Sequence, residues 1–370
     1  MPLGAEHVGR SFRAQAMITG IEVRGLRGIR EGKIEGLAPL TLLVGPNGCG
    51  KSTVLEALGV VCAGRSAKAV FEALSTREWL GLKGLGYWLV KDDTTVIGVF
   101  EPGRIPEEAQ FLSTSKVSCA LDAPAFEGKV RFADEPGHFA IISVIHDVPQ
   151  PSRVAINEDG CIVWSKEDAA AFIPFALQNA FVDRPAGALK RFSGSRFSSA
   201  LRDALTNLKL SPWYDDLFAY LQVLRPKISS IESIAVGDRD EPHIFERDPR
   251  VGYPLAYAGD GFRRSLLLAG AFARAKGGVA AIDEPEAFAH PGMFSALAGL
   301  VRRAIADQTQ VVMATHSLEF VAAALREFEG DPEKVVVVGL RMEGGALDPL
   351  VVAGADAQKR VLELGHDLRL

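Results

Sequence analysis

The fold is decided by residues 40–52, whose sequence is LTLLVGPNGCGKS. The apolar run Leu40–Val44 predicts a buried strand that ends in a glycine-rich turn, and Lys51–Val61 is typical of the helix that follows. Residues Gly45 to Ser52 fit G-x-x-x-x-G-K-[ST] at every fixed position. A strand, a glycine loop and a helix in this order are the context of a phosphate-binding loop. A glycine turn with a purely structural role is the alternative.

The glycines of this loop predict an anion site. They let the backbone curl so that successive N–H groups face phosphates, and the dipole of the following helix adds to the attraction. Lys51 would supply a positive charge to the β- and γ-phosphates during catalysis, and the Ser52 hydroxyl would ligate Mg²⁺. We therefore predict ATP and Mg²⁺ as ligands. The residues expected at the nucleotide are Asn47, Gly48, Cys49, Gly50, Lys51, Ser52 and Thr53.

A second apolar run, Val279–Ile282, ends in the acids Asp283 and Glu284. A buried strand with this ending places carboxylates at the carboxyl edge of a parallel sheet, where ligands bind in α/β folds. We expect Asp283 to hold Mg²⁺ through water and Glu284 to polarise the attacking water. Taken alone, two acids after a strand are equally compatible with a strand that simply meets solvent. The phosphate loop favours the functional interpretation.

The run Val311–Thr315 is followed by His316. A histidine at the end of a neighbouring buried strand can reach the γ-phosphate and report its presence. A capped or solvated histidine in a turn is the alternative, and it would be preferred for an isolated residue. The position of His316 one crossover after the acidic strand reverses that preference.

The composition of the chain limits the classes of protein to which it can belong. The chain has 370 residues, 48% of them hydrophobic and 24% charged, with a formal net charge of -5. These values are typical of a globular protein and give no global basic signal for nucleic acid. No apolar run reaches the roughly 18 residues of a membrane span, and residues 1–15 lack a signal-peptide core, so we expect a cytoplasmic protein. The four cysteines are scattered and are interpreted as free thiols.

The remaining patterns predict how the chain is organised. Short β-rich runs in 94–164 indicate an antiparallel meander, whereas 169–182 is compatible with helix or strand. Helical spacing at 198–210 and 215–224 predicts a helical lobe, and the alternation of helix and strand after Tyr257 predicts parallel sheet with crossovers. The expected units are a mobile extension (1–16), an ATP-binding lobe (17–184 and 259–340), a helical lobe (185–258) and a C-terminal hairpin and helix (341–370). The fold class is therefore α/β, a P-loop NTPase with a mixed sheet and an antiparallel β-subdomain.

Four segments together resemble the SMC/RecF/OLD-like branch of ABC ATPases, and most closely its single-domain ATP-binding members, loosely named AAA. The likeness runs from Met17 to about Val338, with gaps. It implies an ABC head of two lobes and a dimer in which two heads sandwich two ATP molecules. The segments are Gly25–Ile29, Leu40–Gly48, Asp283–Pro291 and Thr315–Phe320.

The resemblance also implies a serine-containing signature loop, supplied to each site by the opposite protomer. The matching segment is Ala258–Arg264, in which Gly259 and Gly261 are present but the serine is missing. We interpret Asp260 as the N-cap of the following helix, and the glycine amides would still meet phosphate. A glutamine linking Mg²⁺ to the helical lobe is expected at Gln178, with Asp183 after it. A surface glutamine is at least as compatible.

Other features of the family are missing from the sequence. OLD proteins carry a Toprim nuclease, but no acidic cluster follows His316 within 335–345, so we predict no intrinsic nuclease. Without heptads, the chain does not resemble a long-armed SMC protein. The basic and aromatic stretch Lys190–Arg202 would suit a nucleic-acid backbone or a partner protein, although a solvated loop is the commoner occurrence.

Two functions remain open at this stage. The first is a slow ATPase whose cycle opens and closes a homodimer in DNA maintenance or anti-phage defence. The second is a non-hydrolytic switch, in which bound ATP licenses the docking of a separate effector protein. The intact Glu284 favours hydrolysis, and the missing serine favours the switch. A P-loop kinase is disfavoured by the acidic pair and by His316.

Overall fold

The computed structural model describes residues 17–63, 94–100, 114–121, 140–145, 152–156, 162–166, 175–179, 214–236, 239–287 and 289–369. In this part of the chain one mixed sheet has thirteen strands in the order β8-β7-β6-β5-β4-β1-β2-β16-β15-β3-β14-β13-β9, and a second sheet has the order β10-β11-β12. The strands of the large sheet are β1 (Ile18–Leu26), β2 (Ile29–Glu35), β3 (Leu40–Val44), β4 (Thr94–Phe100), β5 (Thr114–Leu121), β6 (Ala140–Ile145), β7 (Ser152–Ile156), β8 (Ile162–Lys166), β9 (Phe175–Asn179), β13 (Val279–Asp283), β14 (Gln310–Ala314), β15 (Val335–Glu343) and β16 (Ala346–Ala353).

The centre of the large sheet is parallel. Strands β15, β3, β14, β13 and β9 run side by side in the same direction. Every residue of β3, β13 and β14 is buried, as expected for strands that are covered on both faces. The predicted strands at 40–44, 279–283 and 311–315 and their parallel arrangement are confirmed. Strand β9 shows that residues 175–179 of the ambiguous segment 169–182 form a strand.

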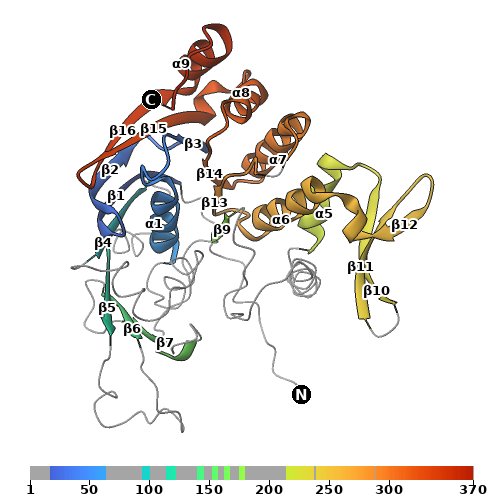
Figure 1. Cartoon of the computed structure of the whole chain (residues 1–370), viewed down its shortest axis with the longest axis horizontal. Coiled ribbons are helices and arrows are strands. Elements are labelled where there is room, and N and C mark those ends of the chain that lie inside the picture. The colour runs from blue at the N-terminus through green and yellow to red at the C-terminus, as the bar shows by residue number, and fades with distance from the viewer. Residues whose placement is uncertain are drawn as a thin grey trace, which may run out of the picture.

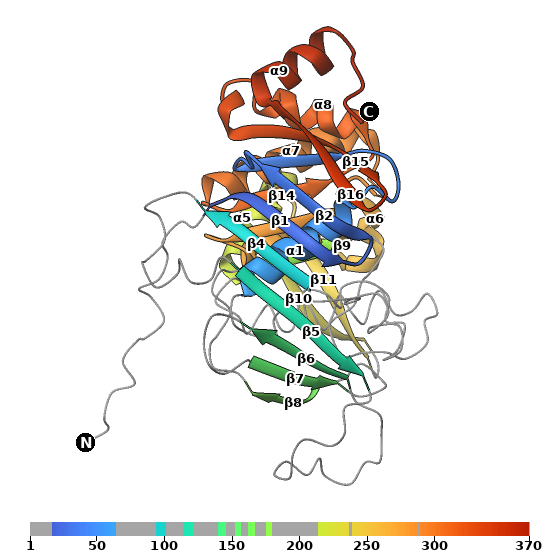
Figure 2. The same ribbon diagram turned by 90° about the vertical axis from the view of Figure 1, so that its left-hand side faces the viewer.

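The rest of the large sheet is mostly antiparallel. β1 pairs with β2 and β4, and β4 to β8 continue as a meander that extends away from the parallel centre (Figure 2). The meander predicted for 94–164 is therefore confirmed for the described strands. The remaining residues of 94–164, like the extension predicted at 1–16, lie outside the described residues.

Two helical layers cover the two faces of the sheet. Helix α1 (Lys51–Ala63) lies in the hollow of the curled sheet, and all of its residues except Ser52 are buried (Figure 1). The opposite face is covered by α5 (Tyr214–Leu224), α6 (Asp260–Arg274), α7 (Phe294–Ala306) and α8 (Leu318–Glu327). Because successive strand residues face opposite sides, Leu43 packs in the core around α1, whereas Leu42 packs with the outer helices.

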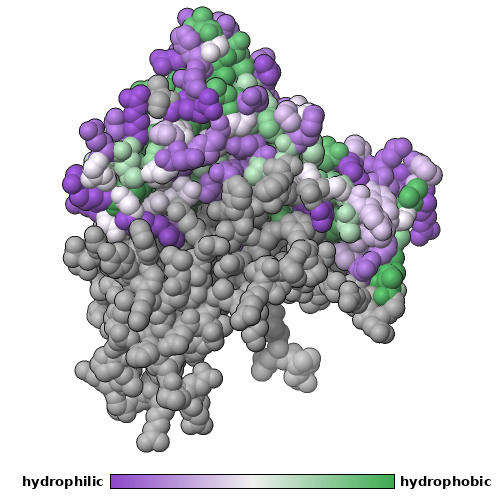
Figure 3. Space-filling model, in the orientation of Figure 1, coloured by the Kyte–Doolittle hydropathy of each residue, from purple (hydrophilic) through white to green (hydrophobic). Residues whose placement is uncertain are grey.

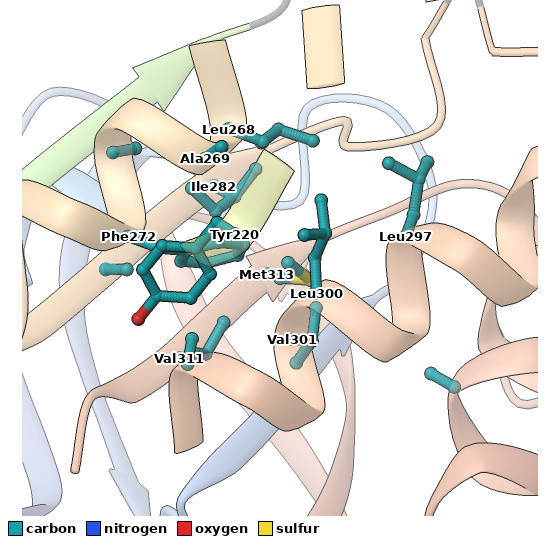
Figure 4. Packing of buried hydrophobic residues seen from close by; sticks show 14 of the residues in the cluster. Tyr220, Leu268, Ala269, Phe272, Ile282, Leu297, Leu300, Val301, Val311 and Met313 are labelled. Carbon is teal, nitrogen blue, oxygen red and sulfur yellow. The ribbon is translucent and has the colours of Figure 1, made fainter. Parts of the chain in front are cut away.

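The core beneath the outer helices combines aromatic and aliphatic side chains. Tyr220 of α5 and Phe272 of α6 lie next to Ile282 and Met313 of the parallel strands (Figure 4). The rings of Tyr220 and Phe272 are 5.8 Å apart between centroids. This packing fixes α6 against the strand that carries the acidic pair.

The predicted helical lobe needs a correction. Helix α5 confirms the helix expected at 215–224, and 198–210 lies outside the described residues. Residues 228–254, however, form the antiparallel sheet of β10 (Ile228–Val236), β11 (Arg239–Glu246) and β12 (Val251–Pro254). This sheet projects to one side of the molecule, beyond α5 and α6 (Figure 1).

The C-terminal part follows its prediction closely. β15 and β16 form the expected hairpin through Gly344 and Gly345. The expected helix at 357–364 begins earlier, as α9 (Gly354–Gln358), and continues as a π-helical turn, η5 (Lys359–Glu363). α9 and η5 contact α8, so this segment closes the outer helical layer.

On the face seen in Figure 3 the described surface is mainly polar, with apolar residues gathered at the α9 end of the molecule. The large hydrophobic residues that are exposed among the described ones are Val223, Val236, Val251, Tyr257, Leu350, Val351 and Leu364. None of the described helices is both long and apolar enough to cross a bilayer.

Candidate nucleotide site

The phosphate loop joins the end of β3 to the start of α1, as predicted. Gly48 and Gly50 have φ angles of +77° and +94°, a region that side-chain-bearing residues rarely adopt. The first helical hydrogen bond runs from the Val54 amide to the Gly50 carbonyl at 2.9 Å. The amides before it, at the N-terminus of α1, therefore face the loop and suit an anion.

Lys51 folds back over this loop. Its Nζ donates to the carbonyl oxygens of Gly45 and Pro46, both at 2.9 Å, and lies 3.7 Å from Cys49 Sγ. The side chain is only 6% exposed. Because these acceptors are neutral, they orient the ammonium without neutralising its charge, which suits a phosphate ligand.

The other predicted loop residues differ in exposure. Asn47 and Gly48 are exposed, Ser52 is half-buried, and Cys49 and Thr53 are buried. Ser52 follows Lys51 in the first turn of α1 and is the one residue of this helix that is not buried.

The acidic strand β13 ends beside this loop. The Asp283 position pairs with Ala314 of β14, and Ala314 pairs with Leu43 of β3. The residues after these three strands therefore share one edge of the sheet. Asp283 is 9% exposed. The sequence-based placement of the phosphate loop, the acids and the histidine at a common carboxyl edge agrees with this register.

Glu284 has an unusual backbone. Its φ is +53°, in the left-handed region that costs about 1 kcal/mol for a residue with a side chain. Its N–H donates to the Ala314 carbonyl at 2.8 Å, so the neighbouring strand holds this conformation. Burial, followed by the charges of Asp283 and Glu286, raises the pKa of Glu284, and the Lys51 charge opposes the shift.

His316 faces Glu284 across the edge. Its Nε2 lies 4.0 Å from Glu284 Oε1. Burial, followed by the positive charge of Lys51, lowers the pKa of His316 below its ordinary value, although Glu286 and Asp283 act in the opposite direction. The histidine is therefore neutral near pH 7. The mutual charge effects place Lys51, Asp283, Glu284 and His316 in one electrostatic cluster.

The concentration of acids provides a test for Mg²⁺. Besides burial, Asp283 and Glu286 each raise the pKa of Glu284, which indicates repulsion among these carboxylates that Lys51 offsets only in part. A divalent cation would relieve it, and a hydroxyl with a carboxylate is the oxygen donor set that Mg²⁺ prefers. The described residues hold no ready-made group of three metal-binding side chains.

The signature-like segment lies on another element. Gly259, with φ of +78°, is the N-cap of α6, and Asp260 is the first helical residue. The prediction that Asp260 caps this helix is therefore wrong by one position. A side chain at Gly261 would approach Met293 Sδ to 2.7 Å, so close packing explains this glycine.

The linking glutamine and the basic stretch are two further predictions, and the described residues cover them only in part. Gln178 lies on β9 opposite Ile282 of β13, next to the acidic end of that strand. Asp183 and the basic stretch 190–202 lie outside the described residues. The linking-glutamine role of Gln178 stays a prediction.

Two residues that contact the loop of His316 were not predicted from the sequence. Glu286 Oε1 accepts hydrogen bonds from Thr315 Oγ1 at 2.7 Å and from the N–H groups of His316 and Ser317 at 3.0 and 3.2 Å. Arg369 Nη1 donates to the His316 carbonyl at 3.0 Å. The second acid of Asp-Glu-Pro-Glu was a usable signal for Glu286, whereas nothing local marks Arg369.

Two family models match the chain. Residues 21–77 match one described as "AAA domain", and residues 194–322 match one described as "AAA domain, putative AbiEii toxin, Type IV TA system". The first match contains the phosphate loop, and the second contains the acidic strand and His316. Each match therefore includes part of the site at the sheet edge.

One curated relative shares a short segment. An uncharacterized protein of Methanocaldococcus jannaschii is 37% identical over 79 residues, which are 20% of this chain and 36% of that protein. The chain thus spans about a third of that relative's length.

The solved structures include SMC heads at low identity. An SMC head bound to the C-winged helix domain of ScpA has a TM-score of 0.47 at 14% identity, covering 91% of this chain and 98% of its own. The SMC head domain of Thermotoga maritima has a TM-score of 0.42 at 14% identity, with coverages of 90% and 98%. A Pyrococcus furiosus SMC head has a TM-score of 0.46 at 15% identity, with coverages of 95% and 100%.

The two AAA-domain matches, together with the α/β fold and its phosphate loop, support a P-loop ATPase.

Proposed function

We propose that the chain hydrolyses Mg-ATP at the sheet edge where β3, β13 and β14 end. The observation that carries the proposal is the electrostatic cluster at this edge. Glu284 lies 4.0 Å from His316, and the Lys51 charge acts on the pKa of both. A phosphate loop alone would support binding, whereas a carboxylate and a neutral imidazole opposite it supply groups for hydrolysis.

Each residue has a distinct role in this proposal. Lys51, already oriented by loop carbonyls, binds the β- and γ-phosphates. Glu284 polarises the attacking water, and its raised pKa makes it a stronger base than an ordinary carboxylate. Neutral His316 contacts the γ-phosphate. Bound between Ser52 and Asp283, Mg²⁺ would neutralise charge that develops on the phosphates.

We further propose that two copies close around the nucleotide, with Gly259 and Gly261 of one copy meeting the ATP of the other. The open space around Gly259 and its place at the N-terminus of α6 support this role. The cycle would serve DNA maintenance or anti-phage defence, and turnover would be slow because catalysis waits for positioning in trans. The toxin–antitoxin wording of one matched family model supports the defence setting.

A non-hydrolytic switch is the second candidate. Residues 258–264 contain no serine, so the contact expected from an opposite protomer is incomplete. In this case ATP would stabilise a conformation that docks a separate effector protein.

Hydrolysis by wild type beside Glu284→Gln, over a range of protein concentrations, tests the proposal. We expect the variant to bind ATP and to lose activity by at least about 100-fold, the usual effect of removing a catalytic base. Lys51→Ala should lose ATP binding. Glu329→Gln, which changes an exposed carboxylate after α8, is the matched control and should behave as wild type.

The outcomes separate the two candidates. Activity that rises with concentration and disappears in Glu284→Gln supports the ATPase. ATP binding without hydrolysis in wild type overturns the ATPase and supports the switch. Wild type that does not bind ATP overturns both.

A further inference from the structure

The backbone of His316 is held on both sides by charged side chains. Its N–H donates to Glu286 Oε1 at 3.0 Å, and its carbonyl accepts from Arg369 Nη1 at 3.0 Å. Glu286 follows β13, and Arg369 follows η5, so the two charged groups come from segments far apart in the chain. The histidine between them belongs to the proposed catalytic cluster.

Glu286 makes further hydrogen bonds to the same loop. The same oxygen also accepts from Thr315 Oγ1 and from the Ser317 N–H. Its other oxygen, Oε2, is buried and has no hydrogen-bond partner in the described part of the chain. Burial of a carboxylate is costly unless donors compensate for lost water, so the three donors of the histidine loop explain why Glu286 is tolerated here.

These bonds are not needed to cap the helix that follows. Ser317 is the N-cap of α8, and its Oγ accepts from the Phe320 N–H at 3.1 Å. Glu286 instead binds the turn before the helix, which is the part that carries His316. Its contacts therefore restrain the histidine rather than the helix end.

Arg369 is itself held in place before it reaches the loop. Asp367 accepts from Arg369 Nε at 3.0 Å and from Nη2 at 2.7 Å, and also from the Arg369 N–H at 2.8 Å. The intervening Leu368 is 4% exposed and belongs to the core of the outer helices. A guanidinium fixed in this way loses little entropy when it donates to the His316 carbonyl.

We propose that Glu286 and Arg369 are positioning residues that clamp the backbone of His316 on either side of its Cα and thereby hold its imidazole opposite Glu284. This inference rests on the proposed function, because the benefit of the clamp lies in ATP hydrolysis. It goes further by assigning to the C-terminal segment Leu364–Arg369 a direct effect on the site. Neither residue touches the reacting atoms, so loss of either should lower kcat while ATP binding persists.

Hydrogen exchange of the nucleotide-free protein tests the clamp without relying on hydrolysis. In Glu286→Ala the His316 amide should exchange at least roughly tenfold faster, because its acceptor is lost, whereas the Ser317 amide keeps Thr315 Oγ1 as an acceptor at 3.0 Å. Glu286→Gln keeps one acceptor oxygen and should restore most of the protection. Glu319→Ala is the matched control, since this exposed carboxylate in the first turn of α8 accepts from the Ser317 hydroxyl. Exchange elsewhere in β14 reports whether the variants remain folded.

Kinetics then test whether the clamp positions a catalytic group. Glu286→Ala and Arg369→Ala should each lower kcat about tenfold with the Kd for ATP within about twofold, and Arg303→Ala in α7 should match wild type. Combined, the two changes should cost less than the product of their separate effects, because both act on the backbone of the same residue.

Each negative result of these experiments would overturn a different part of the proposal. Unchanged exchange in Glu286→Ala overturns the clamp, whatever the ATPase does. Faster exchange with unchanged kcat in both variants overturns the positioning role. Wild type without hydrolysis overturns the proposed ATPase, while the exchange rates still decide whether the clamp exists.

Discussion

Glu284 shows how a single backbone conformation relates to chemistry. Its left-handed φ of +53° would be avoided in an ordinary turn, yet the bond from its N–H to Ala314 secures it. The residue after a buried strand would otherwise continue in the strand direction. The turn at Glu284 sets its carboxylate 4.0 Å from the imidazole of His316. A strained residue retained beside charged neighbours is a common feature of functional sites.

Only those residues of the site that a local sequence pattern marks could be predicted. Lys51, Asp283 and His316 each follow a buried apolar strand, and parallel pairing brings such positions to one edge. Arg369 has no such context. It reaches His316 because η5 and Gly365, with φ of +66°, turn the chain back across the outer helices. That return depends on tertiary packing, which no local pattern encodes.

His316 allows a prediction about pH. Its pKa is lowered in the folded protein by burial and then by Lys51, with Arg369 adding to the shift and Glu286 and Asp283 opposing it. Below about pH 6.5, the ordinary value, the unfolded chain therefore binds a proton more readily than the folded one. This contribution to stability falls as pH decreases through that value and is constant above it. We expect His316 to titrate below pH 6.5.

Nuclear magnetic resonance of the histidine ring protons measures this pKa directly, with His316→Gln to assign the signal. The free energy of unfolding of wild type should also decline more between pH 7.5 and pH 5.5 than that of His316→Gln. A midpoint at or above 6.5 would contradict the prediction. Because the side chain is 34% exposed, solvent screening keeps the effect on stability small.

At the scale of elements, β10 explains why a sheet was mistaken for part of a helical lobe. Ile228, Ile231 and Ile234 recur every third residue, which is a helical spacing. In the structure the strand has a bulge between Ile228 and Ser230, so the side-chain alternation changes phase there. Ile228 and Ile231 are both buried as a result. The extra residue of a bulge cannot be recognised from the periodicity of one strand.

The turn between β1 and β2 is fastened to α1 by a buried ion pair. Arg27 Nε lies 2.6 Å from Glu56 Oε2, and the Glu56 side chain is 1% exposed. Arg27→Ala removes a charge partner from a buried carboxylate, so we expect a loss of about 3 kcal/mol of unfolding free energy. Chemical denaturation measures it. The matched control is Glu35→Ala, which breaks the exposed pair with Lys33 and should leave the midpoint almost unchanged. Equal effects in the two variants would contradict the structural role of the buried pair.

At the scale of the molecule, the curled sheet separates two parts of the proposed mechanism. Its parallel centre gathers Lys51, Asp283, Glu284 and His316 at one edge. The glycine segment at the start of α6 belongs instead to the outer helical layer, beside the sheet of β10 to β12 (Figure 1). A segment on a separate layer is well placed to serve a second copy rather than its own nucleotide. We therefore expect two copies of the chain to associate when ATP is bound.

The last prediction concerns that association. Glu284→Gln with Mg-ATP should form a dimer in sedimentation or light-scattering measurements, because it keeps the nucleotide without turnover. Tyr257 is 80% exposed, two residues before Gly259. Tyr257→Glu in the same background should place a negative charge near the partner's phosphates and weaken the dimer by at least about tenfold, while each monomer still binds ATP. Val351→Glu, an exposed apolar position on β16, is the matched control and should dimerise normally. A monomer under all conditions would refute the sandwich and leave the single-chain switch. A dimer that Tyr257→Glu leaves intact would place the interface away from α6.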